Sequence, residues 1–151
     1  MPAAIKERLA WEDRFRTPTL EQLYAPLNKQ LQGAFDAARE RLLEFEGLSE
    51  SIVWRGIPWR WTVSFNSPDD REGWAYLVPQ PARPYLVLPV SIETLSKLPV
   101  RRLSKFVREG ILHAACVAGV YWPQWDIQTK GQVEDVFAVV AMKHAALQPQ
   151  A

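Results

Sequence analysis

Polar and apolar side chains alternate along the segment from residue 59 to residue 66. The apolar positions are Trp59, Trp61, Val63 and Phe65, and the polar positions are Arg60, Thr62, Ser64 and Asn66. A period of two residues is typical of a β-strand with one buried face. The pattern therefore predicts a strand with its aromatic face in the core and its polar face on the other side.

Two helices are predicted before this strand. Thr19 is a typical N-cap, and a short helix is expected to follow it to about Ala25. Pro26 suits the first turn of a second helix. Apolar residues then recur at spacings of three and four, at Leu27, Leu31, Ala34, Phe35, Ala38, Leu42 and Phe45. This spacing predicts a long amphipathic helix over residues 27–46, closed by Gly47.

The alternating strand belongs to a predicted sheet. Residues 52–54 begin the sheet, and residues 74–78 pair back as a hairpin. Residues 85–90 are almost continuously apolar, which is typical of a strand covered on both faces. Pro89 is expected at the end of that strand, because proline has no amide donor for the ladder.

Helical spacing returns after residue 90. A short helix is predicted over residues 91–98, and a second helix is predicted from Pro99 to Gly119. Residues 120–128 predict a short irregular strand, and a last helix is expected over residues 131–147.

This order of elements predicts an α+β fold. The expected architecture is a two-layer sandwich, in which an antiparallel β-meander of three or four strands is covered by the long N-terminal helix and the C-terminal helices. Residues 1–18 are predicted to form an arm that docks loosely, and residues 19–151 a single domain.

Composition narrows the class of protein. The chain has 151 residues, 48% hydrophobic, with a formal net charge of +1, which is ordinary for a globular domain. Cys116 is the single cysteine, so no intrachain disulfide can form. The sequence predicts no signal peptide and no membrane span, and a soluble cytoplasmic protein is expected.

The segment Ile52-Val53-Trp54-Arg55-Gly56-Ile57-Pro58-Trp59 resembles a motif of small bacterial proteins, the YdhG-like domains of unknown function and their YjbR/MmcQ-like neighbours. The resemblance covers about residues 27–147 and implies a fold more than an activity. Arg55 departs from the tighter family pattern. Some family members are described as iron chaperones, which implies an acidic face. Here basic residues interleave with the acidic ones near residue 40, which argues against the iron-chaperone role. No functional residue is carried over from the family.

His113 and Cys116 are the first candidate site. They are three residues apart in a predicted helix and could form a two-point metal ligand or a thiol–imidazole pair. Small apolar residues surround them, and the chain has no second cysteine. The favoured interpretation is a buried, unreactive Cys116, with no metal and no cofactor bound.

Four basic residues are the second candidate. They recur at three- and four-residue spacing, at Lys97, Arg101, Lys105 and Arg108. Such a stripe could bind phosphates or an acidic partner, but it is also what the solvated face of any surface helix looks like. Tight nucleic-acid binding is not expected. Neutralising phosphates takes many basic residues, which usually gives such proteins a larger positive charge than the +1 of this chain.

Aromatic residues of the sheet are the third candidate. A concave face lined by Arg60, Trp61, Trp74 and Tyr76 could bind a small apolar or planar ligand. Packing of the indoles in the core is the favoured alternative.

Acidic residues in the loop after the strand are the fourth candidate. Asp69, Asp70 and Glu72 could hold a divalent cation. A calcium loop spreads its oxygen ligands over about a dozen residues, so a solvated hairpin tip is favoured.

Three classes of function remain open, in this order. The first is a non-enzymatic interaction or binding module with a protein partner, acting through the open sheet face or the basic helix. The second is a binder of small molecules with an aromatic pocket. The third is an enzyme whose residues converge from distant segments, such as His113, Asp126 and Tyr85. Two histidines and no catalytic motif favour binding over catalysis.

Overall fold

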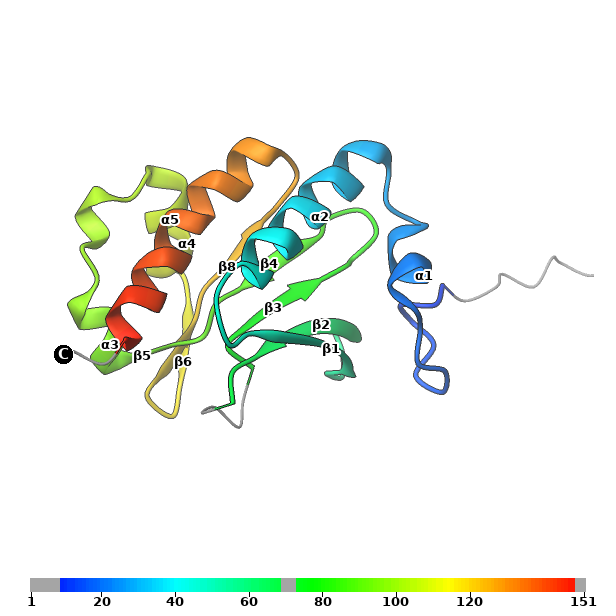
Figure 1. Cartoon of the computed structure of the whole chain (residues 1–151), viewed down its shortest axis with the longest axis horizontal. Helices are drawn as coiled ribbons and strands as arrows, with labels where there is room; N and C mark the ends of the chain where they lie inside the picture. Colours follow the sequence, from blue (N-terminus) through cyan, green and yellow to red (C-terminus); the bar gives the residue numbers. More distant parts are fainter. Residues whose placement is uncertain (1–8, 69–72, 149–151) are drawn as a thin grey trace, which may run out of the picture.

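The computed structural model describes residues 9–68 and 73–148, and within them the chain forms an α+β fold (Figure 1). A five-stranded antiparallel sheet runs in the order β1-β2-β3-β4-β8. Its strands are β1 (Ser49–Trp54), β2 (Trp61–Asn66), β3 (Ala75–Val78), β4 (Tyr85–Val87) and β8 (Gln124–Asp126). The predicted class and the helix-covered antiparallel meander are confirmed.

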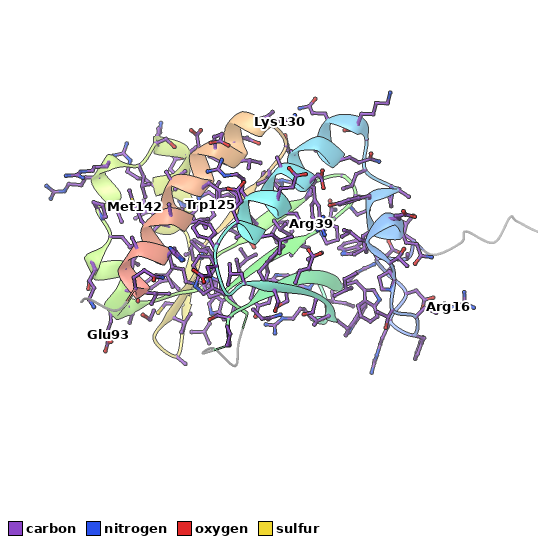
Figure 2. The ribbon with its side chains drawn as sticks, in the orientation of Figure 1. Arg16, Arg39, Glu93, Trp125, Lys130 and Met142 are labelled. Carbon is purple, nitrogen blue, oxygen red and sulfur yellow. The ribbon has the colours of Figure 1, made fainter. Side chains whose placement is uncertain are left out.

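A second, smaller sheet has the order β5-β7-β6, with β5 (Val90–Ser91), β6 (Ala115–Val117) and β7 (Val120–Trp122). The helices are α1 (Leu20–Tyr24), α2 (Lys29–Leu43), α3 (Ile92–Lys97), η1 (Val100–Arg102), α4 (Lys105–Leu112) and α5 (Lys130–Leu147). In Figure 1, α2 in cyan and α5 in orange lie side by side over one face of the large sheet. Side chains fill the space between these layers, with Trp125 inside and Lys130 and Arg16 at the periphery (Figure 2).

Side-chain caps explain where the first helices begin. Thr19 and Gln22 form a capping box at α1, as the N-cap prediction requires. Asn28 caps α2 by accepting a hydrogen bond from the Leu31 amide at 2.8 Å. The long helix therefore starts after Asn28 rather than in the turn of Pro26, and it ends before Phe45 and Gly47. Its buried stripe is as predicted: Leu31, Ala34, Phe35, Ala38 and Leu42.

Strand β2 is buried on both faces, which corrects the prediction of a single buried face. Thr62 is 0% exposed and Ser64 is 3% exposed. Tyr76 lies opposite Ser64 in β3 and shares its face, and the ring of Trp59 packs on Tyr76 with centroids 5.2 Å apart. Trp59 therefore covers the face that was predicted to be polar.

The left-handed backbone conformation of Arg60 explains why Trp59 lies on the opposite face from the one predicted. Arg60 has φ +59°, so β2 begins only at Trp61 and the strict alternation does not extend back to Trp59. Trp61 itself lies on the helix-covered face, at 7% exposure.

The predicted single helix over residues 99–118 is wrong: its first half is divided into η1 and the start of α4, and its second half is mostly not helical. Helix α4 ends at Leu112, and the chain turns back as the β6–β7 hairpin. Ala118 (φ +51°) and Gly119 (φ +80°) form its two-residue turn. Positive φ at both positions is the geometry of a type I′ turn, which matches the twist of the paired strands.

The described part of the N-terminal arm docks firmly, contrary to the expectation of a loose contact. Trp11 is 6% exposed, and its indole N–H donates to the Trp59 carbonyl at 2.9 Å. In return, the Trp61 indole donates to the Asp13 carbonyl at 2.6 Å. These two exchanged hydrogen bonds hold residues 9–18 against the start of β2.

Candidate functional site

A cavity of about 590 Å³ lies where α4, β8, the β6–β7 hairpin and the loop before β2 meet. Its lining includes Trp59, Arg83, Phe106, Glu109, His113, Trp122, Gln124 and Asp126. We call it the Trp59–Trp122 cavity. It combines aromatic surface with a few polar groups, which is the usual composition of small-molecule sites.

Two half-buried indoles supply the aromatic surface. Trp59 and Trp122 approach edge to face, with ring centroids 6.2 Å apart. Behind them, Tyr76 stacks on Trp122 at 6.2 Å, and the Arg55 guanidinium lies 4.9 Å from the Tyr76 ring. Tyr76, which is buried and contacts both rings, holds the two indoles in place from the buried side.

A close contact between α4 and β8 fixes another side of the cavity. The Trp125 indole is 3% exposed, and its N–H donates to the Val107 carbonyl at 3.0 Å. A Cβ at Gly110 would lie 2.7 Å from Cε2 of Trp125 and closer still to Nε1. Gly110 therefore lets the helix backbone approach the indole, and both residues line the cavity.

His113 places an imidazole in the lining at the C-cap of α4. Its Nδ1 is 2.8 Å from the Glu109 carbonyl oxygen. Because a carbonyl can only accept, Nδ1 carries a proton, and Nε2 of the neutral ring keeps its lone pair. In this neutral form, His113 can accept a hydrogen bond from a ligand through Nε2.

The charges of the cavity are mixed, with a small acidic excess. Arg83 and Asp126 form an ion pair at 2.9 Å, while the second carboxylate, Glu109, is 3.8 Å from Lys105. Among its Arg, Lys, Asp and Glu residues, the lining carries one cationic and two anionic side chains. This favours a neutral or cationic ligand over an anion.

The predicted aromatic ligand site does not exist as one surface. Trp61, Trp74 and Tyr76 are 7%, 4% and 1% exposed. Trp74 packs against Lys143 of α5, whose ammonium lies 4.4 Å from the ring. Arg60 pairs with Glu12 at 3.4 Å. The four residues are separated by the sheet and its packing, and of them only Tyr76 supports the cavity, from behind.

The predicted basic stripe is spread over three elements. Lys97 belongs to α3, Arg101 to η1, and Lys105 and Arg108 to α4. All four are exposed. They are therefore surface residues of separate short helices and do not follow one helical face.

His113 and Cys116 also lie on different elements, the C-cap of α4 and strand β6. Cys116 is exposed, so the prediction of a buried thiol is wrong. Within residues 9–68 and 73–148, no three His, Cys, Asp or Glu side chains gather to hold a metal ion. The acidic loop candidate, Asp69, Asp70 and Glu72, falls outside the described residues.

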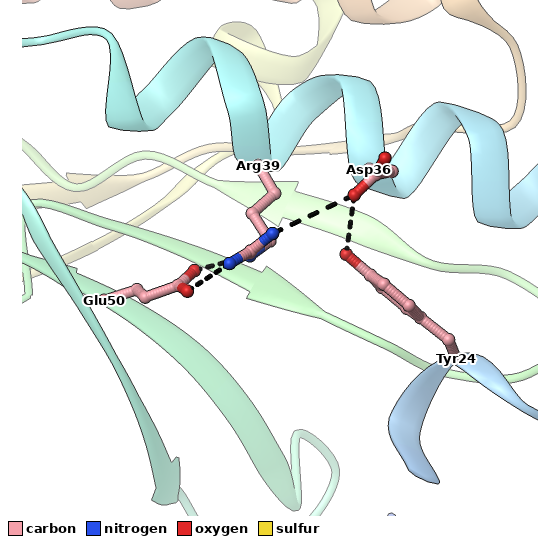
Figure 3. A network of polar contacts seen from close by, with 4 residues as sticks. All are labelled: Tyr24, Asp36, Arg39 and Glu50. Atoms are coloured by element: carbon pink, nitrogen blue, oxygen red, sulfur yellow. Dashed lines mark hydrogen bonds and ion pairs between the residues drawn. The ribbon is translucent and has the colours of Figure 1, made fainter. Parts of the chain in front are cut away.

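A polar network joins α1, α2 and β1 away from the cavity (Figure 3). The Tyr24 hydroxyl donates to Asp36 at 3.2 Å, and Arg39 binds Glu50 through two of its nitrogens. Burial raises the pKa of the Tyr24 phenol, and Asp36 adds to this effect. The hydrogen bond with Glu50 raises the pKa of the Arg39 guanidinium. Because each group has a partner inside the network, its role is to fasten helices to the sheet edge.

Sequence reasoning anticipated part of the cavity. His113 and Asp126, two of the three residues suggested for a convergent enzyme, do line it. Tyr85 lies opposite Asp126 in β4, and burial raises the pKa of its phenol. Trp122 was missed, because its neighbours in sequence give no sign that it meets Trp59.

A scan against protein-family models finds no match for the chain, and a search of curated proteins finds none either. In the described ranges, no helix has the length and apolar character needed to cross a membrane.

Proposed function

We propose that this chain is a small-molecule binding protein and that the Trp59–Trp122 cavity is its binding site. The observation that supports this most is the meeting of two half-buried indoles from distant segments beside hydrogen-bonding side chains. A rigid aromatic wall with a few polar groups is how proteins bind planar organic molecules.

The lining suggests the chemistry of the ligand. A planar ring would stack on Trp59 or Trp122, while Gln124 and His113 offer hydrogen bonds to its edge. The acidic excess from Glu109 favours a neutral or cationic ring, such as a nitrogen heterocycle or an arylamidine.

Two other functions have weaker support. Catalysis would use His113, but this ring hydrogen-bonds a backbone carbonyl, whereas a catalytic histidine is usually oriented by a carboxylate. A protein-interaction module acting through a basic helix is less favoured because the basic residues are spread over three elements.

Three probes with the same ring but different charge test the proposal: benzamidine, benzamide and benzoate. Calorimetric titration should show the tightest binding for benzamidine and the weakest for benzoate. Trp122→Ala should weaken benzamidine binding by about 1–2 kcal/mol, or roughly 5–30-fold, by removing one stacking surface.

Phe15→Ala is the matched control, because Phe15 is an exposed aromatic outside the cavity, at 84% exposure. It should leave the affinity unchanged. Equal loss in both variants, or binding of none of the three probes at millimolar concentration, would overturn the proposal.

A further inference from the structure

The β6–β7 hairpin presents an uncharged strand edge to solvent. Strand β6 is an outer strand of the small sheet and pairs only with β7 in the described chain. All three of its residues are exposed, and Val117 retains 62% of its accessible surface. Figure 1 shows the hairpin in yellow, projecting from the body of the molecule.

Apart from its short length of three residues, this edge lacks the features that normally prevent strand pairing. Proteins protect exposed edges with lysine, proline, bulges or inward-pointing charges. No Asp, Glu, Lys or Arg occurs from Gly110 to Trp125, and the strand Ala-Cys-Val contains no proline. The outer strand β1 of the large sheet differs, since it carries Glu50 in an ion pair with Arg39.

The turn geometry shows which backbone groups face outward. Val117 and Val120 flank the two-residue turn, so they form the hydrogen-bonded pair that closes it. Hydrogen-bonded and non-hydrogen-bonded pairs alternate along an antiparallel ladder. The next pair, Cys116 and Tyr121, is therefore not hydrogen-bonded. Cys116 directs its N–H and C=O away from β7, toward the open edge.

We propose that β6 pairs antiparallel with β6 of a second copy of this chain, about a two-fold axis at Cys116. The two three-stranded sheets then form one sheet of six strands. Cys116 exchanges both backbone hydrogen bonds with Cys116 of the second copy, and Ala115 faces Val117 across the new pair.

Charge is the reason to expect a second copy rather than another partner. A two-fold interface brings a surface against itself, so any charge on it meets the same charge. An uncharged strand avoids this repulsion, and a small alanine opposite a branched valine leaves room for pairing. The contact is short, so association is expected to be weak, with a dissociation constant on the order of 100 µM.

Sedimentation analysis over a concentration series tests the pairing. Wild type and Cys116→Ser should shift toward dimer, because serine keeps the backbone donor. Cys116→Pro should stay monomeric, since proline removes the outward N–H while fitting an edge position. Val117→Lys should also stay monomeric, through repulsion across the axis, and circular dichroism should confirm that both variants fold.

The single cysteine provides a second test with a different readout. Opposed Cα atoms of a hydrogen-bonded pair lie about 5.5 Å apart, which is within the range of a disulfide. With copper–phenanthroline as oxidant, wild type should form a disulfide dimer at least about tenfold faster than Cys116→Ser/Ser51→Cys, because pairing raises the effective thiol concentration. Ser51 is an exposed residue of β1, so a cysteine placed there measures the rate of cross-linking by random collision.

Wild type that stays monomeric to about 1 mM, or equal rates of cross-linking, would overturn the proposal. Dimers that persist in both Cys116→Pro and Val117→Lys would overturn it as well, because the contact would then lie elsewhere.

Discussion

Replacement of Gly110 by alanine should destabilise the protein strongly, although alanine is the better helix former. Gly110 lies within α4, and its missing side chain makes room for the Trp125 indole. An added Cβ would overlap the indole ring, which is buried and cannot swing into solvent. Either α4 or β8 must shift, and the hydrogen bond from Trp125 to the Val107 carbonyl is then strained or lost.

The magnitude follows from these two effects. Overpacking a dense core costs about 1–3 kcal/mol, and leaving a buried donor unpaired costs about 1–3 kcal/mol more. The helix propensity of alanine offsets up to about 1 kcal/mol. The net loss should be about 1–5 kcal/mol, a large share of the stability of a typical domain.

Gly33 offers a matched control in α2. A Cβ there would meet only Lys130 Cε at 3.8 Å, an ordinary contact. Gly33→Ala should therefore stabilise the protein by about 0.5–1 kcal/mol. Urea unfolding followed by circular dichroism measures both variants. A Gly110→Ala protein as stable as Gly33→Ala would refute the close packing of α4 on Trp125.

Three further predictions concern the hairpin, the polar network and the thiol. Ala118→Asn should raise the free energy of unfolding by about 0.5–1 kcal/mol, because Asn-Gly suits a turn with two positive φ angles; an unchanged urea midpoint would contradict this. The pKa of Tyr24 is raised above its ordinary 10.0, so the unfolded chain loses that proton first, and stability present below pH 10 falls as pH rises above it. Tyr24→Phe should therefore show a shallower alkaline loss of stability than wild type, and identical slopes would argue against the raised pKa. Cys116 is exposed, so a thiol reagent should label the native protein about as fast as the urea-unfolded chain; strong protection in the native state would contradict its placement.

The strands and helices that rest on local patterns were predictable. The spacing of three and four residues around Phe35 predicted the position of α2. The capping side chain of Thr19 predicted the start of α1. Pro89 falls between β4 and β5, as a residue without an amide donor must. These signals depend only on neighbours in the sequence.

The errors occurred where distant segments decide the outcome. Apolar residues continue at helical spacing past Leu112, and such short runs do not distinguish a helix from a strand. Ala118 gives no hint of a left-handed turn, because alanine rarely adopts positive φ. Thr62 and Ser64 look like solvent-facing residues, yet they are buried in a face that Tyr76 and Trp59 help to cover.

The cavity also depends on contacts between distant segments, so local sequence patterns did not predict it. His113 and Asp126 were suggested together as members of a convergent site, but no local sequence pattern indicated the cavity that they line. Trp59 and Trp122 meet only because Arg60 reverses the side-chain order before β2 and because the β6–β7 hairpin folds back from α4. Both events depend on residues with positive φ: Arg60 before β2, and Ala118 and Gly119 in the hairpin turn.

The central claim, that the Trp59–Trp122 cavity binds a planar ligand, is tested most directly by the NMR signals of the indole N–H groups. Titration with benzamidine should move the signals of Trp59 and Trp122, which border the cavity. The signals of Trp61 and Trp74, which are buried elsewhere, should stay in place. Shifts confined to tryptophans outside the cavity, or no shift at saturating probe, would contradict the account.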